Sequence, residues 1–447
     1  MSHIGYTGET LNFLEANNVT IWSRVEIIFK TGTKILGIIL PGLERSDKYI
    51  YIKLPNGYNI AVSIEKITSI KLIEKLDIKY EIPEVKVKQK SDLPRLLLLG
   101  AGGTIASRVE YETGAVKPAF SERELLNAVP ELYNLAIVEA QNLFNIFSED
   151  MKPEYWITLA KKIHTLVLEE DYRGVVITHG TDTMHYTASA LSFMLQNLPV
   201  PIVLTGAQRS SDRPASDSAV NLIASVITAT RSEIGEVMIV MHASLDDETC
   251  YAHRGVRARK MHSSRRDAFK TIGDEPLAKV TISNDNYQFE YLKSDFKRVT
   301  PNREYFELYP YFENKTALVY IYPNFAKEII ESLIDHKYRG IVLVGTGLGH
   351  VPEHLLDTIS RGINEGILFA MATQCIWGPV GMNVYERGRK LQKLGVIPAN
   401  GMLPETAYVK LGWVLGFESD YNKAREIFSK NIANEILLRE NLKSYIC

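Results

Sequence analysis

Two stretches of the sequence share one pattern, in which an apolar run ends in a glycine turn that presents a threonine. They cover residues 96–107 (LLLLGAGGTIAS) and 174–184 (GVVITHGTDTM). Each apolar run is short and bounded by turn residues, which is typical of a buried strand. The glycines permit a tight turn in which a side chain would clash. Because open α/β sheets bind ligands beyond the carboxyl ends of their strands, Thr104 and Thr181 are candidate site residues.

The segments around these turns predict an α/β fold with a parallel sheet, because strand and helix patterns alternate. Pro153 opens a predicted helix that runs to residue 169. Asp182 or Thr183 can cap the helix that follows the second threonine turn. An irregular, strand-like stretch over 275–315 separates this region from a second α/β unit. The further predicted strands are 201–205, 236–241, 316–321, 340–344 and 368–373, and the further helices are 215–229, 326–335, 352–364, 404–412 and an amphipathic 422–441.

The first 75 residues have a different pattern, with short β-rich pieces separated by turn signals such as Asn56-Gly57. This spacing predicts a small β-barrel or sandwich. Residues 76–94 carry lysines and prolines with little that could be buried, which is typical of a linker. The charge of residues 1–90 is weakly positive, which leaves open both RNA binding and a structural or docking role. The predicted strands are 24–29, 34–40, 49–54 and 58–62.

Composition narrows the class of protein. A chain of 447 residues suggests two or three domains, and 45% apolar with 23% charged residues is typical of a globular protein. A net charge of −2 does not favour nucleic-acid binding by the whole chain. Three cysteines without C-x-x-C spacing indicate a reducing compartment. With no signal peptide and no membrane-length apolar run, we expect a cytoplasmic protein that does not enter the membrane.

A third stretch, residues 257–263 (RARKMHS), completes a set of motifs. Together with G-G-T-I-A and H-G-T-D-T, it resembles the L-asparaginase family. The resemblance implies an α/β fold of two asparaginase-like domains. We therefore predict a small all-β, barrel-like domain over 1–75, a linker over 76–94, an asparaginase-like domain with the active site over 95–300, and a second one over 301–447.

The resemblance also implies amide hydrolysis through a threonine acyl-enzyme. Thr104 matches the nucleophile, and Tyr111 matches a loop tyrosine that helps to activate it. Thr181, Asp182 and Lys260 match the second catalytic group. A lysine that lies beside a carboxylate and is shielded from water can share or lose its proton more readily than a surface lysine. Lys260 would then serve Thr181 or water as a base, and Asp182 would orient and neutralise it.

Substrate binding has its own matching residues. An α-amino acid needs carboxylates for its ammonium group, and N–H and hydroxyl donors for its carboxylate. By resemblance, Ser148 and Glu149 make these contacts, and Asp182 shares the ammonium. Backbone N–H groups at the turns that contain Gly103 and Gly180 can hold the anionic groups and the oxyanion.

Each motif has a simpler interpretation. The threonines can be ordinary turn residues. Lys260 lies among Arg257, Arg259, Arg265 and Arg266, which is the pattern of a solvated or phosphate-facing patch. Residues 350–354 (HVPEH) fit a zinc pattern, but a proline interrupts the helix that such a site needs, so we expect no metal. No G-x-x-x-x-G-K-[ST] motif occurs, so ATP binding by this chain is not indicated.

Residues 32–57 resemble the N-terminal domain of the D subunits of archaeal glutamyl-tRNA(Gln) amidotransferases. That resemblance implies a glutaminase or asparaginase-type subunit of a carbon–nitrogen ligase that uses glutamine as amido donor. The E subunit of the amidotransferase would receive the ammonia, bind Glu-tRNA(Gln) and use ATP with Mg²⁺, whereas this chain would need no cofactor. The resemblance also implies a homodimer within a D2E2 assembly that contacts tRNA(Gln) mainly through the E subunits.

Two other classes stay open on sequence alone. The chain can be a free-standing L-asparaginase with an added N-terminal domain, or a non-catalytic module that uses the same pocket for binding. The sequence does not decide which threonine is acylated first, or whether Gln or Asn is preferred.

Overall fold

The computed structural model describes residues 3, 5–42, 46–55, 58–75, 92–103, 107–109, 116–118, 129–209, 215–283, 286–437, 439–441 and 444. The chain divides into two compact units. The first comprises Met1–Ser148, Val176–Thr181 and Thr205–Val226, and the second comprises Glu149–Val175, Asp182–Leu204 and Ile227–Cys447. In the described part of the chain, no helix combines the length and apolar character needed to cross a bilayer.

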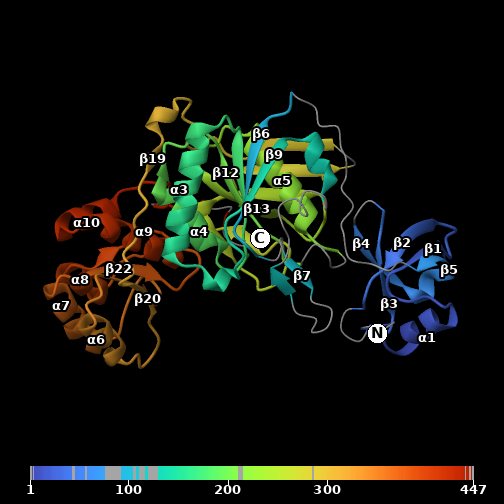
Figure 1. Cartoon of the computed structure of the whole chain (residues 1–447). Helices are drawn as coiled ribbons and strands as arrows, with labels where there is room; N and C mark the ends of the chain where they lie inside the picture. Colours follow the sequence, from blue (N-terminus) through green and yellow to red (C-terminus); the bar gives the residue numbers. More distant parts are fainter. Residues whose placement is uncertain are drawn as a thin grey trace. The chain divides into compact units, whose positions relative to one another are not determined.

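The N-terminal part of the first unit is a five-stranded antiparallel sheet in the order β4-β3-β2-β1-β5 (Figure 1). Alternate residues of β1, such as Val25 and Ile27, are buried in its core, as expected for a half-buried strand. The four predicted strands are confirmed, but the helix α1 and the strand β5 were not predicted. The elements are α1 (Gly8–Ala16), β1 (Ser23–Phe29), β2 (Lys34–Ile39), β3 (Tyr49–Lys53), β4 (Asn59–Ser63), the 3-10 turn Ile64–Lys66 and β5 (Ile67–Lys75).

The rest of the first unit contains the strands that lead to the two threonine turns. Strand β6 pairs in parallel with β9, with Leu96 opposite Val138. Residues Leu96–Leu99 are all buried, which explains why the run is continuously apolar. The elements are β6 (Arg95–Gly100), the hairpin of β7 (Ser107–Val109) and β8 (Val116–Pro118), the 3-10 turns Pro130–Asn134 and Ser148–Asp150, β9 (Ile137–Asn142), β10 (Gly174–Thr178) and α5 (Ser218–Arg231).

In the second unit, five strands run in the order β18-β17-β14-β13-β12. Strands β12 and β13 are parallel, but the pairs β13–β14, β14–β17 and β17–β18 are antiparallel. The sheet is therefore mixed and not parallel throughout, because the connection over 243–248 is too short for a crossover helix. The elements are α3 (Pro153–Glu169), α4 (Met184–Met194), β12 (Ile202–Thr205), β13 (Val237–His242), β14 (Thr249–Arg254), β17 (Ala278–Ser283) and β18 (Asn286–Tyr291).

Two short pairs of strands belong to the same unit. Strand β15 (Ala258–Lys260) pairs with β16 (Phe269–Thr271), and it follows directly on the 3-10 turn Gly255–Arg257. Strand β11 (Leu195–Gln196) pairs with β19 (Glu307–Leu308), close in sequence to the 3-10 turn Arg303–Tyr305.

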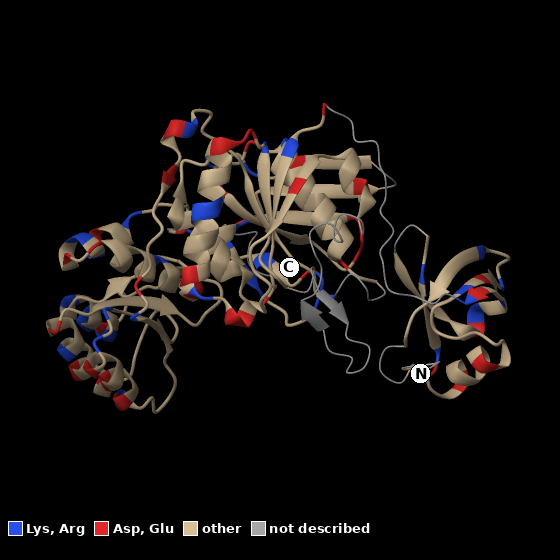
Figure 2. Ribbon diagram, viewed as in Figure 1, with Lys and Arg blue, Asp and Glu red and all other residues tan. Residues whose placement is uncertain are grey.

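The C-terminal part of the second unit is a parallel four-stranded sheet in the order β20-β21-β22-β23. It lies between α9 on one face and α6, α7 and α8 on the other (Figure 1). Charged residues follow the outer helices, whereas the strands between them carry few (Figure 2). The elements are β20 (Thr316–Tyr320), α6 (Lys327–Asp335), β21 (Gly340–Gly345), the 3-10 turn Glu353–Leu355, α7 (Leu356–Asn364), β22 (Leu368–Thr373), α8 (Glu386–Leu394), β23 (Ile397–Pro398) and α9 (Pro404–Phe417).

The last predicted helix is wrong over most of its length. Helix α10 covers Tyr421–Ser429, and the chain then continues without regular structure, whereas the sequence predicted helix over 422–441. Asn434 has a left-handed backbone with φ of 62°, which a helix does not allow. The backbone N–H groups of Ile432 and Ala433 donate to the Glu435 carboxylate. We call the described residues 430–437 and 439–441 the C-terminal strap.

Candidate active site

The two glycine turns of the first unit pack against each other. Gly102 and Gly103 have φ of 86° and 87°, in the region that favours glycine. A Cβ at Gly103 would lie 2.2 Å from the backbone nitrogen of Gly180, so no side chain fits there. The Ala101 N–H also donates to the Thr178 carbonyl at 2.9 Å. Glycine at position 103 therefore lets the first turn approach the second one closely.

Ser148 lies against the second turn. A Cβ at Gly180 would come within 2.5 Å of the Ser148 Cβ, and the Ser148 side chain is buried. Thr181, the next residue along the turn, is only 6% exposed. The structure thus brings Gly103, Gly180 and Ser148 together, with Thr181 directly after Gly180 in sequence. Glu149 follows Ser148 in a 3-10 turn and is exposed to solvent.

His179 shapes this turn, although it was not among the predicted site residues. Its ring Nδ1 lies 2.7 Å from the Gly180 carbonyl oxygen, which can only accept, so Nδ1 carries the proton. Complete burial lowers the pKa of His179 to about 4, so the ring is neutral at pH 7. The histidine therefore fixes the Gly180 peptide without adding charge beside Thr181. Its position before a Gly-Thr-Asp turn was the signal available in the sequence.

Asp182 and Lys260 form an ion pair in the second unit. The Lys260 Nζ donates to Asp182 Oδ1 at 2.6 Å. The lysine side chain is only 9% exposed, whereas the aspartate side chain is 67% exposed. Asp182 lies just before α4, and Lys260 ends β15 opposite Phe269 of β16. The shielded lysine beside a carboxylate has the arrangement expected of a base with its orienting partner.

The arginines around Lys260 have partners of their own. Arg257 is buried, and the other three form ion pairs with carboxylates. Because their charges are paired with carboxylates, these arginines are poorly suited to form a phosphate-binding patch. The pairs are Arg259–Glu405 at 3.0 Å, Arg265–Asp267 at 2.8 Å and Arg266–Asp247.

Thr104 and Tyr111 lie outside the described residues, so their places in the site stay predictions. A further contact was not predicted: the Asp217 carboxylate accepts from the backbone N–H groups of Gln208 and Arg209, each at 3.0 Å. It fixes the loop that follows β12. The Gln208 Nε2 atom is buried and has no hydrogen-bond partner in the described part of the chain.

Residues of the HVPEH pattern at 350–354 take part in local structure. The His354 Nε2 lies 2.9 Å from the Phe325 carbonyl oxygen, and Pro352 precedes the 3-10 turn that leads into α7. Among the residues that the structure describes, no group of three or more His, Cys, Asp or Glu side chains could hold a metal ion.

Comparison with family models matches three regions of the chain. Residues 20–73 match the GatD N-terminal domain, residues 95–294 match "Asparaginase, N-terminal", and residues 315–428 match the glutaminase/asparaginase C-terminal domain. Among solved structures, the L-asparaginase from Thermococcus kodakarensis superimposes with a TM-score of 0.66 at 31% identity, covering 77% of this chain and 99% of that one. L-asparaginase I from Vibrio cholerae gives the same TM-score at 27% identity, covering 77% of this chain and all of that one.

Relatives similar over nearly the whole length carry one name, that of the D subunit of glutamyl-tRNA(Gln) amidotransferase. The protein from Pyrococcus abyssi is 48% identical over 97% of this chain and 99% of its own length. The protein from Methanopyrus kandleri is 44% identical over 96% of this chain and 94% of its own length. The chain therefore belongs to the asparaginase family of amidohydrolases and, within it, to the group of glutamyl-tRNA(Gln) amidotransferase D subunits.

Proposed function

We propose that this chain releases ammonia from glutamine or asparagine through a threonine acyl-enzyme, and that the ammonia feeds a partner subunit that converts Glu-tRNA(Gln) to Gln-tRNA(Gln). The observation that carries the chemistry is the ion pair of Lys260 with Asp182, directly after Thr181 in the second glycine turn. The relatives named as amidotransferase D subunits support the pathway.

The reaction needs two steps. The Thr104 hydroxyl attacks the side-chain amide carbon, its proton passes through Tyr111 to the leaving amide nitrogen, and the C–N bond breaks to release ammonia and leave a threonine ester. Water then attacks the ester and restores the threonine. Lys260 takes the proton from Thr181 or from the water, and Asp182 holds the lysine in place. Backbone N–H groups of the Gly103 and Gly180 turns hold the negative oxygen of each tetrahedral intermediate.

Substrate binding uses the polar groups beside that turn. One oxygen of Asp182 contacts Lys260, and the exposure of this carboxylate leaves it accessible to the ammonium group of an amino acid. In this proposal Glu149 shares that ammonium, and Ser148 contacts the substrate carboxylate. Asp182 thus has two roles, one toward the base and one toward the substrate.

The partner is the E subunit, which carries the ligase chemistry. We infer that it binds Glu-tRNA(Gln), activates the glutamyl group with ATP and Mg²⁺, and accepts the ammonia. This chain needs no cofactor of its own for amide hydrolysis. In the proposed D2E2 assembly two copies of this chain join two E subunits, and tRNA(Gln) is contacted mainly through the E subunits.

A rate measurement tests the coupling. Ammonia release from Gln is measured with the purified chain alone, and again with the E subunit and Glu-tRNA(Gln). Weak release that rises in the full assembly is the expected result. Fast release that does not change with either addition would show a free-standing enzyme. The match to asparaginases favours that alternative, because 77% of this chain covers 99% of one asparaginase chain and 100% of the other.

Variants test the chemistry in the same assay. We expect Thr104→Ala, Thr181→Ala and Lys260→Met each to lower ammonia release by at least about 100-fold. Lys270→Met is the matched control, because this lysine lies on the neighbouring strand β16 and pairs with Asp267. If Thr104→Ala and Thr181→Ala both keep full release, the chain is a binding module and not a hydrolase.

A further inference from the structure

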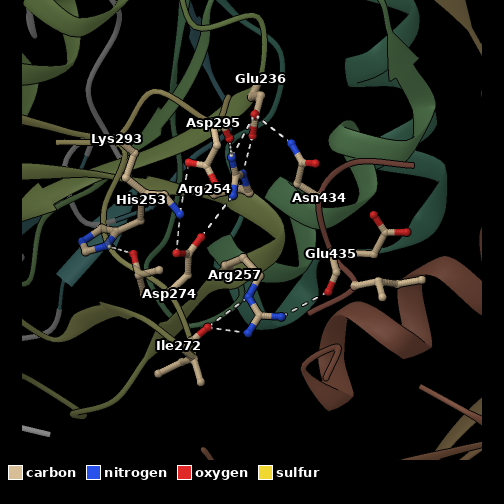
Figure 3. A network of polar contacts seen from close by, with 12 residues as sticks. Glu236, His253, Arg254, Arg257, Ile272, Asp274, Lys293, Asp295, Asn434 and Glu435 are labelled. Carbon is tan, nitrogen blue, oxygen red and sulfur yellow. Dashed lines mark hydrogen bonds and ion pairs between the residues drawn. The ribbon is translucent and has the colours of Figure 1, made fainter. Parts of the chain in front are cut away.

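Arg257 lies three residues before Lys260 and is one of the most deeply buried charged groups of the described chain, at 2% exposure. Figure 3 shows its guanidinium between the Ile272 segment and the C-terminal strap. Burial lowers the pKa of Arg257 to about 10, so the side chain is charged at neutral pH. A buried charge of this kind is costly unless its hydrogen bonds are satisfied, so its contacts are informative.

All its hydrogen-bond acceptors in the described part of the chain are main-chain carbonyls. The Nε and Nη2 atoms donate to the Ile272 oxygen at 3.0 and 2.5 Å. The Nη1 atom donates to the oxygens of Gly401 at 2.7 Å and Glu435 at 3.1 Å. We call this arrangement the Arg257 clamp. It joins three segments that are far apart in sequence.

Arg254, on the same segment, shows a different arrangement. It donates to the carboxylates of Glu236 at 2.6 Å and Asp274 at 3.2 Å, as a buried cation usually does (Figure 3). Its charge is thus neutralised where it lies. The Arg257 clamp instead uses the planar fork of the guanidinium to hold backbone segments at fixed spacing.

The clamp acts directly on the strand that carries Lys260. The Ile272 N–H donates to the Arg257 carbonyl at 2.9 Å, so these two residues close the end of the β15–β16 hairpin from both sides. Lys260 lies at the other end of β15, opposite Phe269. The strand is only three residues long, so we expect a shift of Arg257 to displace Lys260 as well.

The far side of the clamp is equally well held. The Glu435 carboxylate accepts from Lys410 of α9 and from the N–H groups of Ile432 and Ala433. Lys410 and Glu435 are both fully buried. These contacts fix the Glu435 carbonyl that receives Arg257. The part of the strap that receives Arg257 is therefore held by hydrogen bonds of its own.

We propose that Arg257 is a positioning residue for the amidohydrolase reaction, which sets Lys260 against Asp182 by holding the β15–β16 hairpin to Gly401 and the C-terminal strap. This inference rests on the proposed role of Lys260 as a base. It assigns a catalytic consequence to the C-terminal strap, which contains none of the proposed site residues.

The first test separates positioning from binding. Arg257→Lys keeps the charge but loses the fork, and we expect kcat for Gln hydrolysis to fall by about 10- to 100-fold with KM nearly unchanged, as for a small misplacement of a catalytic group. Arg254→Gln is the control: it removes a buried arginine of the same segment, and it should lower stability while leaving kcat intact. Equal kcat values for Arg257→Lys and the wild type would refute the proposal.

A glycine pair provides a second test that keeps Arg257 itself. Gly273 has φ of 74°, and a Cβ there would lie 2.5 Å from Arg257 Nη2. Gly366 has φ of 87° with nothing within 4 Å of its Cβ position. Both alanine variants carry the backbone strain, but only Gly273→Ala displaces the guanidinium. We expect a loss of kcat for Gly273→Ala alone, and equal effects of the two variants would contradict the clamp.

Chemical rescue distinguishes positioning from general destabilisation, because added guanidinium ion would not restore kcat to a variant that is merely unstable. Arg257→Ala leaves a space with three carbonyl oxygens, and added guanidinium ion, below denaturing concentration, should restore part of kcat. If Arg257→Ala does not fold, the lysine and glycine variants still decide the question. If Lys260→Met retains wild-type activity, the proposed function is wrong. If Lys260→Met loses activity but Arg257→Lys does not, only the positioning role of Arg257 is refuted.

Discussion

The buried pair of Lys410 and Glu435 gives a strong prediction about stability. Lys410→Met removes the ammonium group and leaves the Glu435 carboxylate in a site without solvent access. Removal of one partner of a buried ion pair typically costs about 3–5 kcal/mol. Two backbone N–H groups still donate to this carboxylate, so we expect a free energy of unfolding lowered by about 3 kcal/mol, near the lower limit.

The reverse change is expected to cost more. Glu435→Leu leaves the Lys410 ammonium with the Lys430 carbonyl, and it also removes the acceptor for the N–H groups of Ile432 and Ala433. Each unsatisfied buried donor adds about 1–3 kcal/mol. Lys410→Met with Glu435→Gln removes both charges and keeps an oxygen for the N–H groups. We expect this double variant to be more stable than Glu435→Leu by about 2 kcal/mol or more.

Denaturant unfolding measures the free energy of unfolding of the single and double variants. Glu435→Gln completes a double-mutant cycle, which gives the coupling energy of the pair. The exposed pair Lys327–Glu331 on α6, at 3.1 Å, is the matched control and should show a coupling below about 1 kcal/mol. The reasoning fails if the Lys410–Glu435 coupling is as small as that of the surface pair. Such a result would mean that water reaches the pair.

Two further predictions concern acid stability and the glycine turn. Burial lowers the pKa of His253 to about 3 from 6.5, so below pH 6.5 the unfolded chain binds more protons than the folded one. The free energy of unfolding therefore falls as the pH is lowered, by up to about 1.4 kcal/mol per pH unit. His253→Gln should remove this contribution when the free energy of unfolding is measured across the same pH range. An unchanged slope would show that His253 is protonated in the fold. Gly103→Ala should lower ammonia release by at least about 10-fold, because its Cβ meets Gly180, whereas Gly32→Ala, with φ of 82° and open space, should not.

Local signals allowed much of the fold to be predicted. The apolar run before Gly100 and the run Val175–Ile177 form buried strands, because a continuous apolar segment between turn residues has few other stable arrangements. The Lys260–Asp182 contact joins residues 78 positions apart, and spacing alone could not have given it. It was anticipated from family resemblance, which supplies tertiary information that a local pattern lacks.

The errors have physical causes. The strap has the pattern of an amphipathic helix, but Glu435 binds backbone N–H groups of its own segment, and Lys410 draws the Lys430 carbonyl away from a helical partner. The sequence predicted a parallel sheet, but β13 pairs antiparallel with β14, a strand that was not predicted because its sequence, TCYAHR, has no continuous apolar run. Helix α1 was missed because its sequence carries only a weak apolar stripe, with Leu14 as its most buried apolar residue.

The use of main-chain carbonyls by Arg257 has a consequence for how this region can change in evolution. A carbonyl oxygen is present whatever side chain the residue carries, so the strap can accept many substitutions around Glu435 without losing the contact. Insertion or deletion of one residue before Glu435 would shift the carbonyls of the strap by one position, so that a different carbonyl would face Arg257. We expect homologous straps to differ in composition but to agree in length, so that a count of residues between the last helix and this contact identifies the clamp better than sequence identity does.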